Sequence, residues 1–190
     1  WLRRTNRTAS WFVAGGASIN IDALRGQAGV DVQWQTTRLE SIQQGEPMPY
    51  RLATLTLSPR FNLRLARWFN TEYRLNYRRS VLGIEQQERS VQHSFDQQLQ
   101  LHFAPTRQLV IRLTGEHYYT QLTSTQRKHL VLVDASLGWK VGERWELTLT
   151  ATNLLDRDSY TYTLFDGPSS SSYRYAIRPR NLLLGASWRF

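Results

Sequence analysis

Polar and apolar side chains alternate with a period of two along most of this chain of 190 residues. Between Val91 and Phe103 most odd positions are apolar, whereas every even position from Gln92 to His102 is polar. Successive side chains of a strand point to opposite faces, so this pattern predicts strands with one apolar and one polar face. The four-residue spacing typical of an amphipathic helix is sustained nowhere. The chain is therefore predicted to be all-β.

The alternation predicts about nine strands, most of them with ten or more residues. Strands of globular proteins average about five or six residues, so these are too long for an ordinary sandwich. Tilted strands of about 9–11 residues cross a bilayer, which favours an antiparallel transmembrane β-barrel. The predicted strands cover residues 8–21, 26–40, 50–65, 69–78, 91–103, 109–120, 128–140, 145–155 and 173–190.

Short and long connections are predicted to alternate along the chain. Successive connections of an antiparallel meander lie at opposite ends of its sheet, so one end would carry short turns and the other long loops. Outer-membrane barrels show this asymmetry, whereas a propeller blade would need four short strands in each period of about 40 residues. The short connections are expected near 22–24, 66–68, 105–107 and 141–144, and the long ones near 43–49, 80–90, 122–128 and 156–172.

Composition narrows the class of protein further. Arg, Gln, Asn or Ser interrupts every apolar run, so no stretch approaches the roughly 20 apolar residues of a membrane-spanning helix. Aromatic residues make up 12% of the chain, which argues against disorder, and the absence of cysteine excludes disulfides and thiolate sites. The formal net charge is +9, but the arginines form no dense patch, and no nucleic-acid partner is expected. The chain opens at Trp1 without methionine or an apolar signal segment, so a processed or partial product is expected.

Aromatic residues gather near the predicted strand ends, as they do at the two water interfaces of a membrane barrel. The alternative is the general preference of aromatic residues for strands. Near the short connections lie Trp68, Phe69, Phe103, Trp139, Trp145, Trp188 and Phe190, and near the long ones lie Tyr50, Tyr77, Tyr118, Tyr119, Tyr160, Tyr162, Tyr173 and Tyr175.

Two segments near the C-terminus carry the most specific motifs. One is the run Asn153, Leu154, Leu155 and Asp156, and the other is residues 178–190, which begin Arg-Pro-Arg and end in phenylalanine. Together they resemble the end of a TonB-dependent outer-membrane receptor. The resemblance implies that the apolar residues of the last strand form the signal read by the barrel-assembly machinery, namely Leu182, Leu184, Ala186, Trp188 and Phe190.

The resemblance also implies a function, which is energy-coupled import of a scarce solute such as a siderophore, glycan or peptide. Receptors of this family have a 22-stranded barrel around a plug. Residues 1–190 are therefore expected to form a C-terminal segment of the barrel, with the plug and the TonB box outside the chain. Expected partners are outer-membrane lipid and lipopolysaccharide, the remainder of the barrel and plug, TonB, and a surface lipoprotein. A small closed barrel acting as a passive pore, or a structural or adhesive anchor, is the alternative.

Charged residues on the polar faces are predicted to line the barrel lumen, with the C-terminus in the periplasm. Such a wall could be only a solvated surface, or its arginines could bind acidic plug groups or guide anionic solutes. The four histidines His93, His102, His117 and His129 share no ligand spacing, so no metal site, cofactor or enzymatic activity is expected. The lumen-facing candidates are Arg60, Arg64, Glu72, Arg74, Arg78, Asp96, Arg112 and Glu116.

Overall fold

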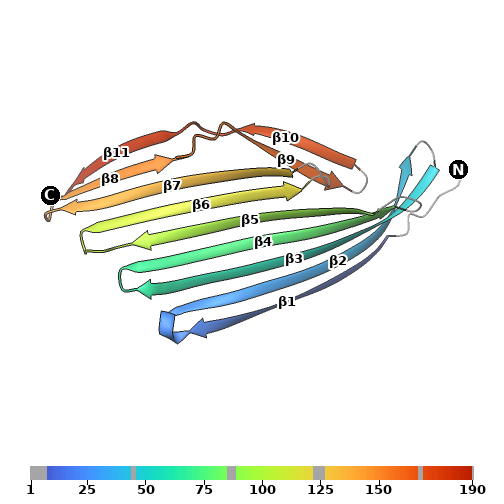
Figure 1. The fold of residues 1–190 in the computed structure, drawn as a ribbon, viewed down its shortest axis with the longest axis horizontal. Coiled ribbons are helices and arrows are strands. Elements are labelled where there is room, and N and C mark those ends of the chain that lie inside the picture. The colour runs from blue at the N-terminus through green and yellow to red at the C-terminus, as the bar shows by residue number, and fades with distance from the viewer. Residues whose placement is uncertain (1–7, 44–45, 85–88, 122–126, 167–168, 190) are drawn as a thin grey trace.

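The protein is almost entirely antiparallel β-sheet in a computed structural model, which describes residues 8–43, 46–84, 89–121, 127–166 and 169–189. Figure 1 shows long strands that lie side by side across the molecule. The strands are β1 (Ala9–Ile21), β2 (Gly26–Gln43), β3 (Glu46–Ala66), β4 (Phe69–Ile84), β5 (Ser90–Phe103), β6 (Leu109–Gln121), β7 (Arg127–Val141), β8 (Trp145–Thr152), β9 (Ser159–Asp166), β10 (Ser169–Ala176) and β11 (Asn181–Trp188).

Nine of these strands form one sheet in the order β1-β2-β3-β4-β5-β6-β7-β8-β11, and β9 pairs with β10 in a separate hairpin. The predicted all-β class is confirmed. The predicted single strand over 173–190 is wrong, because it is divided between β10 and β11 by residues 177–180. Pro179 lies in this break and has no N–H to donate to a ladder. The predicted strand over 145–155 ends at Thr152, because Asn153 adopts a positive φ of 51°.

The predicted alternation of short and long connections is also wrong. Strands β2 and β3 stay paired up to Gln43 and Glu46, so the expected loop over 43–49 is mostly strand. Strand β4 likewise continues to Ile84, and the connections 85–89 and 104–108 have equal lengths. A continued ladder satisfies backbone N–H and C=O groups that a loop would leave to water or side chains. The polar segments therefore extend the hairpins.

The short turns at the other end lie where the sequence places them. The turn between β1 and β2 is the 3-10 helix η1 (Asp22–Leu24), which ends at Arg25 in the left-handed region. The Arg25 N–H donates to the Asp22 carbonyl oxygen at 3.1 Å and closes the turn. No helix among the described residues is long and apolar enough to cross a bilayer.

The sheet is a single layer, and its large apolar side chains lack a covering layer. In the described part of the chain, only Leu130 and Ala151 are apolar residues with buried side chains. Residues that are directly paired on neighbouring strands share a face. Leu99 pairs with Tyr73 and Gly115, whereas the preceding Gln98 pairs with Arg74 and Glu116. We call these two sides the apolar face and the charged face.

Candidate functional site

All eight charged residues predicted to line a lumen lie on the charged face. The pairing of Arg60 with Arg74, of Arg74 with Gln98, and of Gln98 with Glu116 places these side chains in one row across β3 to β6. Neighbouring rows hold the others through directly paired positions. Glu72 pairs with Asn62, Arg64 with Asn70, Arg78 with Thr56, Asp96 with Asn76, and Arg112 with His102.

The charged face is hollowed. A hollow of about 390 Å³ is lined by Arg60, Arg74, Asp96, Glu116 and Tyr118, among others. Two further hollows, of about 220 and 330 Å³, are lined mainly by residues of the same face, around Arg112 and Arg78 respectively. Hollows between polar side chains agree with a face that meets water.

The charges on this face are only partly neutralised. Arg60 forms an ion pair with Asp31, and Arg74 forms one with Glu72, with all four side chains partly exposed. Exposed pairs of this kind stabilise a fold by at most about 1 kcal/mol. The eight candidates comprise five arginines and three carboxylates, which gives 5 − 3 = +2. With Asp31, which lies on the same face, the described residues of β2 to β6 place five arginines and four carboxylates there, 5 − 4 = +1, so the net charge of the face is close to zero and its arginines are separate positions for an anion.

Glu116 is the centre of a hydrogen-bonded group in the hollow that Arg60, Arg74 and Tyr118 also line. Its carboxylate accepts hydrogen bonds from the Gln98 amide (3.2 Å) and the Tyr118 hydroxyl (2.8 Å). The Tyr118 ring also lies 5.6 Å from that of Tyr160, which belongs to β9. Tyr118 thus shares the charged face, whereas Tyr119 stacks on Phe95 of the apolar face at 4.8 Å. The prediction that Tyr118 and Tyr119 both belong to the same interfacial band of aromatic residues is therefore wrong, because their side chains lie on opposite faces of the sheet.

The remaining aromatic candidates occupy two regions. We call the end of the sheet that carries the short turns the turn end. There the ring centroids of Phe69 and Phe103 lie 4.4 Å apart with Trp68 beside them, and those of Trp145 and Trp188 lie 6.2 Å apart. Trp139 is half-exposed at the same end of β7. In the β9–β10 hairpin, Tyr173 pairs with Tyr162 and Tyr175 pairs with Tyr160. The side chain of Tyr162 lies outside the described residues.

Polar side chains also occur on the apolar face, where they bond to one another. The Tyr73 hydroxyl donates to Gln97 Oε1 at 2.8 Å, and the Gln97 amide donates to His117 Nδ1 at 2.9 Å. The ring centroids of His117 and His129 lie 6.5 Å apart, and His93 Nδ1 lies 2.7 Å from the Tyr77 hydroxyl oxygen. The described residues contain no group of three or more His, Cys, Asp or Glu suited to hold a metal ion.

Replacing Gln97, the middle residue of the hydrogen-bonded series Tyr73–Gln97–His117, should destabilise the fold. In Gln97→Leu, the Tyr73 hydroxyl and His117 Nδ1 lose their partner, which costs about 1–3 kcal/mol in an apolar setting. Replacing all three residues at once, with Phe at 73 and Leu at 97 and 117, should be nearly neutral. Urea unfolding of the full-length protein in lipid vesicles measures both. Equal losses for the single and triple variants would contradict this explanation.

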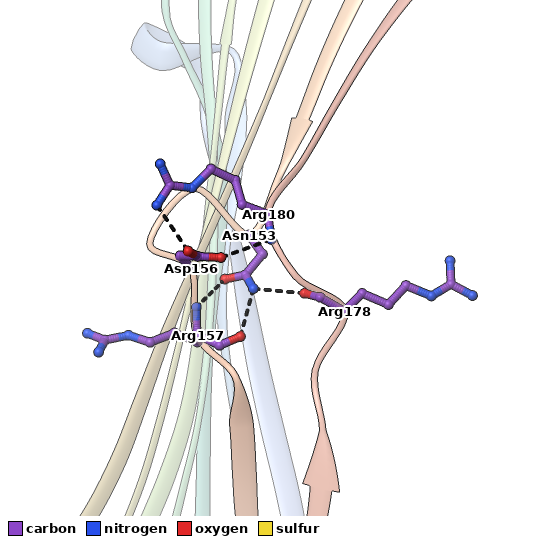
Figure 2. A network of polar contacts seen from close by, with 5 residues as sticks. All are labelled: Asn153, Asp156, Arg157, Arg178 and Arg180. Carbon is purple, nitrogen blue, oxygen red and sulfur yellow. Dashed lines mark hydrogen bonds and ion pairs between the residues drawn. The ribbon is translucent and has the colours of Figure 1, made fainter.

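The Asn-Leu-Leu-Asp motif follows β8 and forms a compact junction with the segment that leads into β11 (Figure 2). Asn153 is buried, and its amide donates to the carbonyl oxygens of Arg157 (2.8 Å) and Arg178 (2.9 Å). Its Oδ1 accepts the Arg157 N–H at 2.9 Å, while its own N–H donates to Asp134 Oδ1 at 2.8 Å. The Asn153 side chain thereby joins the turn after β8 to the segment before β11, and the Asn153 backbone N–H adds the link to β7.

Asp156 holds the same junction from its other side. It has a φ of 54°, and its carboxylate accepts the Arg180 N–H at 3.1 Å and pairs with the Arg180 guanidinium at 3.4 Å. Asparagine and aspartate tolerate left-handed backbone better than most residues. Leu154 contributes a backbone bond to the Val133 carbonyl oxygen (2.8 Å), and Leu155 is exposed.

The predicted assembly signal lies on one face of β11. Leu182, Leu184 and Ala186 pair with Ala151, Leu149 and Leu147 on the apolar face, and Trp188 pairs with Trp145. Leu184 is 78% exposed. Phe190 lies outside the described residues. The sequence analysis missed Asp31, whose place on the charged face follows from its parity within β2.

The fold and its two faces define a class, which is the wall of an outer-membrane β-barrel. Strands of barrel length, an uncovered apolar face and a hollowed, charged opposite face are the features of such a wall. This architecture agrees with the antiparallel barrel segment predicted from the sequence.

Two known proteins are similar to this chain. The pesticin receptor of Yersinia pestis is 32% identical over 62 residues, which are 33% of this chain and 9% of the receptor. The FrpB iron transporter from Neisseria meningitidis (F3-3 variant) superposes with a TM-score of 0.47 and 11% identity, covering 97% of this chain and 34% of the transporter. The chain thus spans about a third of that transporter's length. No protein-family model matches it.

The chain is similar to part of the barrel of TonB-dependent outer-membrane receptors. The motifs at Asn153–Asp156 and in the last strand first indicated this resemblance, and the match to the pesticin receptor confirms it.

Proposed function

We propose that this chain forms part of the barrel wall of a TonB-dependent outer-membrane transporter that imports a scarce, negatively charged solute. The observation that carries the proposal is the register, which gathers five arginines on one hollowed face, together with four carboxylates. In the membrane, the apolar face contacts lipid and the charged face lines the lumen. The turn end, with the C-terminus, faces the periplasm.

The lumen wall then acts electrostatically. Its arginines bind an anionic solute in passing, or bind acidic groups of a plug that moves during transport. Arginine suits both tasks, because its planar guanidinium binds carboxylates through two parallel hydrogen bonds. The partners proposed with this function are a plug, TonB and a surface lipoprotein. A siderophore is the first solute class to test, because many siderophores are anionic chelates.

Uptake of a radiolabelled ferric siderophore by cells that express the full-length protein tests the proposal. Uptake should disappear when tonB is deleted. The double variant Arg74→Gln, Arg78→Gln should take up an anionic chelate about tenfold more slowly, because electrostatic guidance of a charged solute depends on such side chains. Uptake of a neutral chelate should change little.

Arg107→Gln is a matched control, because Arg107 is exposed in the turn 104–108 at the opposite end of the strands. This variant should transport like the wild type. TonB-independent uptake would contradict the energy-coupled function and favour a passive pore. Equal losses for anionic and neutral chelates would contradict the role of the charged face in selectivity.

A further inference from the structure

Four polar side chains form a row across the apolar face, at the end of the strands away from the short turns. The register pairs Arg79 with His93, His93 with Gln121, and Gln121 with Arg127. We call these four residues the basic row. Neighbouring strands lie about 4.8 Å apart, so three spacings separate the backbones of Arg79 and Arg127 by roughly 14 Å.

The basic row lies one membrane thickness from the stacked aromatic residues at the turn end. Arg79 follows Phe69 by 79 − 69 = 10 residues, and His93 precedes Phe103 by the same number. Ten residues rise about 33 Å along a strand, or about 23 Å along the membrane normal at a tilt of 45°. This height matches the apolar band of outer-membrane barrels, which is about 25 Å tall.

The charges of the row are not neutralised by the sheet. No carboxylate shares the apolar face with it on the described parts of β4 to β7. Arg79 and Arg127 are exposed, and neither forms an ion pair with a described residue. The Tyr77 hydroxyl holds the His93 ring in place at 2.7 Å. Two guanidinium groups therefore remain available to an external anion.

The next row toward the membrane centre is aromatic. It contains Tyr77, Phe95 and Tyr119, with Phe95 stacked on Tyr119, and it ends at His129. Tyrosine is enriched at the level of lipid headgroups, where its ring contacts acyl chains and its hydroxyl contacts water. A ligand of the basic row would therefore have its charged part beside the arginines and an apolar part against these rings.

We propose that the basic row binds the phosphate groups of a lipid in the outer leaflet, namely the phosphorylated headgroup of lipopolysaccharide. The charge complementarity is direct, since arginine binds phosphate through two hydrogen bonds. The apolar surface below the row distinguishes a lipid from a free anion. The proposal rests on the membrane orientation in the proposed function, but not on transport.

Titration of the full-length detergent-solubilised protein with purified lipopolysaccharide, followed by native mass spectrometry, tests this site. Arg79→Gln, Arg127→Gln should weaken binding about thirtyfold, since each basic side chain near an anionic lipid surface contributes about fivefold. Dephosphorylated lipopolysaccharide should bind the wild type as weakly as intact lipid binds the double variant. Inorganic phosphate at millimolar concentration should not compete.

The sequence offers closely matched controls, because Arg78 and Lys128 are the immediate neighbours of the two arginines and lie on the opposite face. Arg78→Gln, Lys128→Gln removes the same two charges and should leave the lipid affinity unchanged. Arg79→Lys, Arg127→Lys keeps the charge and should bind within about threefold of the wild type, even if the glutamine variant fails to assemble.

Two results would overturn the proposal. Equal weakening by the two glutamine pairs would mean that total charge, and not this row, attracts the lipid. Competition by inorganic phosphate would identify a small-anion site instead. Wild-type protein that binds lipopolysaccharide but imports no solute would leave this site standing and contradict only the proposed transport function. Import without such binding would do the reverse.

Discussion

The substitution Leu99→Arg is expected to destabilise the membrane-inserted protein by about 2–4 kcal/mol. The neighbouring substitution Gln98→Arg should change its stability by less than about 0.5 kcal/mol. Leu99 lies on the apolar face near the middle of the proposed membrane span, and Gln98 lies beside Glu116 on the charged face. A charged side chain in hydrocarbon loses its hydration, but the same side chain in a wet lumen keeps it. Urea unfolding in lipid vesicles measures both variants.

A depth control separates lipid from a dry protein core. Val141 is exposed at the turn end of β7, so Val141→Arg should cost only about 0–1 kcal/mol in a bilayer. These 190 residues contain no cysteine, so a single cysteine at 98 or 99 is the one thiol that this part of the protein contributes to labelling. A maleimide in water should react at 98 but not at 99, and brominated lipid should quench a fluorophore only at 99. Equal labelling at both positions would contradict the assignment of the two faces.

The substitution Asn153→Ala is expected to lower the free energy of unfolding by about 3–5 kcal/mol. It removes three side-chain hydrogen bonds, leaves two carbonyl groups and one N–H without those partners, and places alanine at a φ of 51°. An unsatisfied buried polar group costs about 1–3 kcal/mol, and left-handed backbone costs about 1–2 kcal/mol for a residue with an ordinary Cβ. The midpoint of urea unfolding and the yield of assembled protein should both fall.

Two control variants identify the source of this loss. Asn153→Asp keeps Oδ1 and the tolerance of a positive φ but loses both amide donors, so its destabilisation should be intermediate. Arg178→Ala should be nearly neutral, because Asn153 bonds to the carbonyl oxygen of Arg178 and not to its side chain. A large effect of Arg178→Ala would mean that the junction depends on charge rather than on the Asn153 amide.

Periodicity was sufficient to predict the main sheet, because the alternation of side chains is a local property of each strand. It failed at β9 and β10, where Ser169–Ser172 have the composition of a loop but pair with residues 163–166. Backbone pairing satisfies a ladder whatever the side chains are, so composition did not reveal this hairpin. The break before β11 contains Pro179, and Asn153 holds it through a hydrogen bond to Arg178 across 25 residues of sequence.

Parity was sufficient to place all eight candidates on one face, where they lie in one row or in neighbouring rows, and their position in a lumen stays a prediction. Tyr118 was misplaced because it was grouped with Tyr119 by proximity along the chain. Adjacent strand residues face opposite sides, so parity alone would have separated them. The ion pair between Asp31 and Arg60 required the register of β2 and β3, which depends on how two strands meet and not on either strand alone.

Strand β3 has 21 residues, about twice the number that crosses a bilayer. At about 3.3 Å per residue and a tilt of 45°, it reaches roughly 50 Å along the membrane normal, against an apolar band of about 25 Å. In the proposed orientation, the excess rises beyond the outer surface as a collar whose strands remain hydrogen-bonded to each other. An arriving solute would thus meet an entrance of fixed shape, and amides in this collar should exchange slowly with deuterium although they lie far above the lipid.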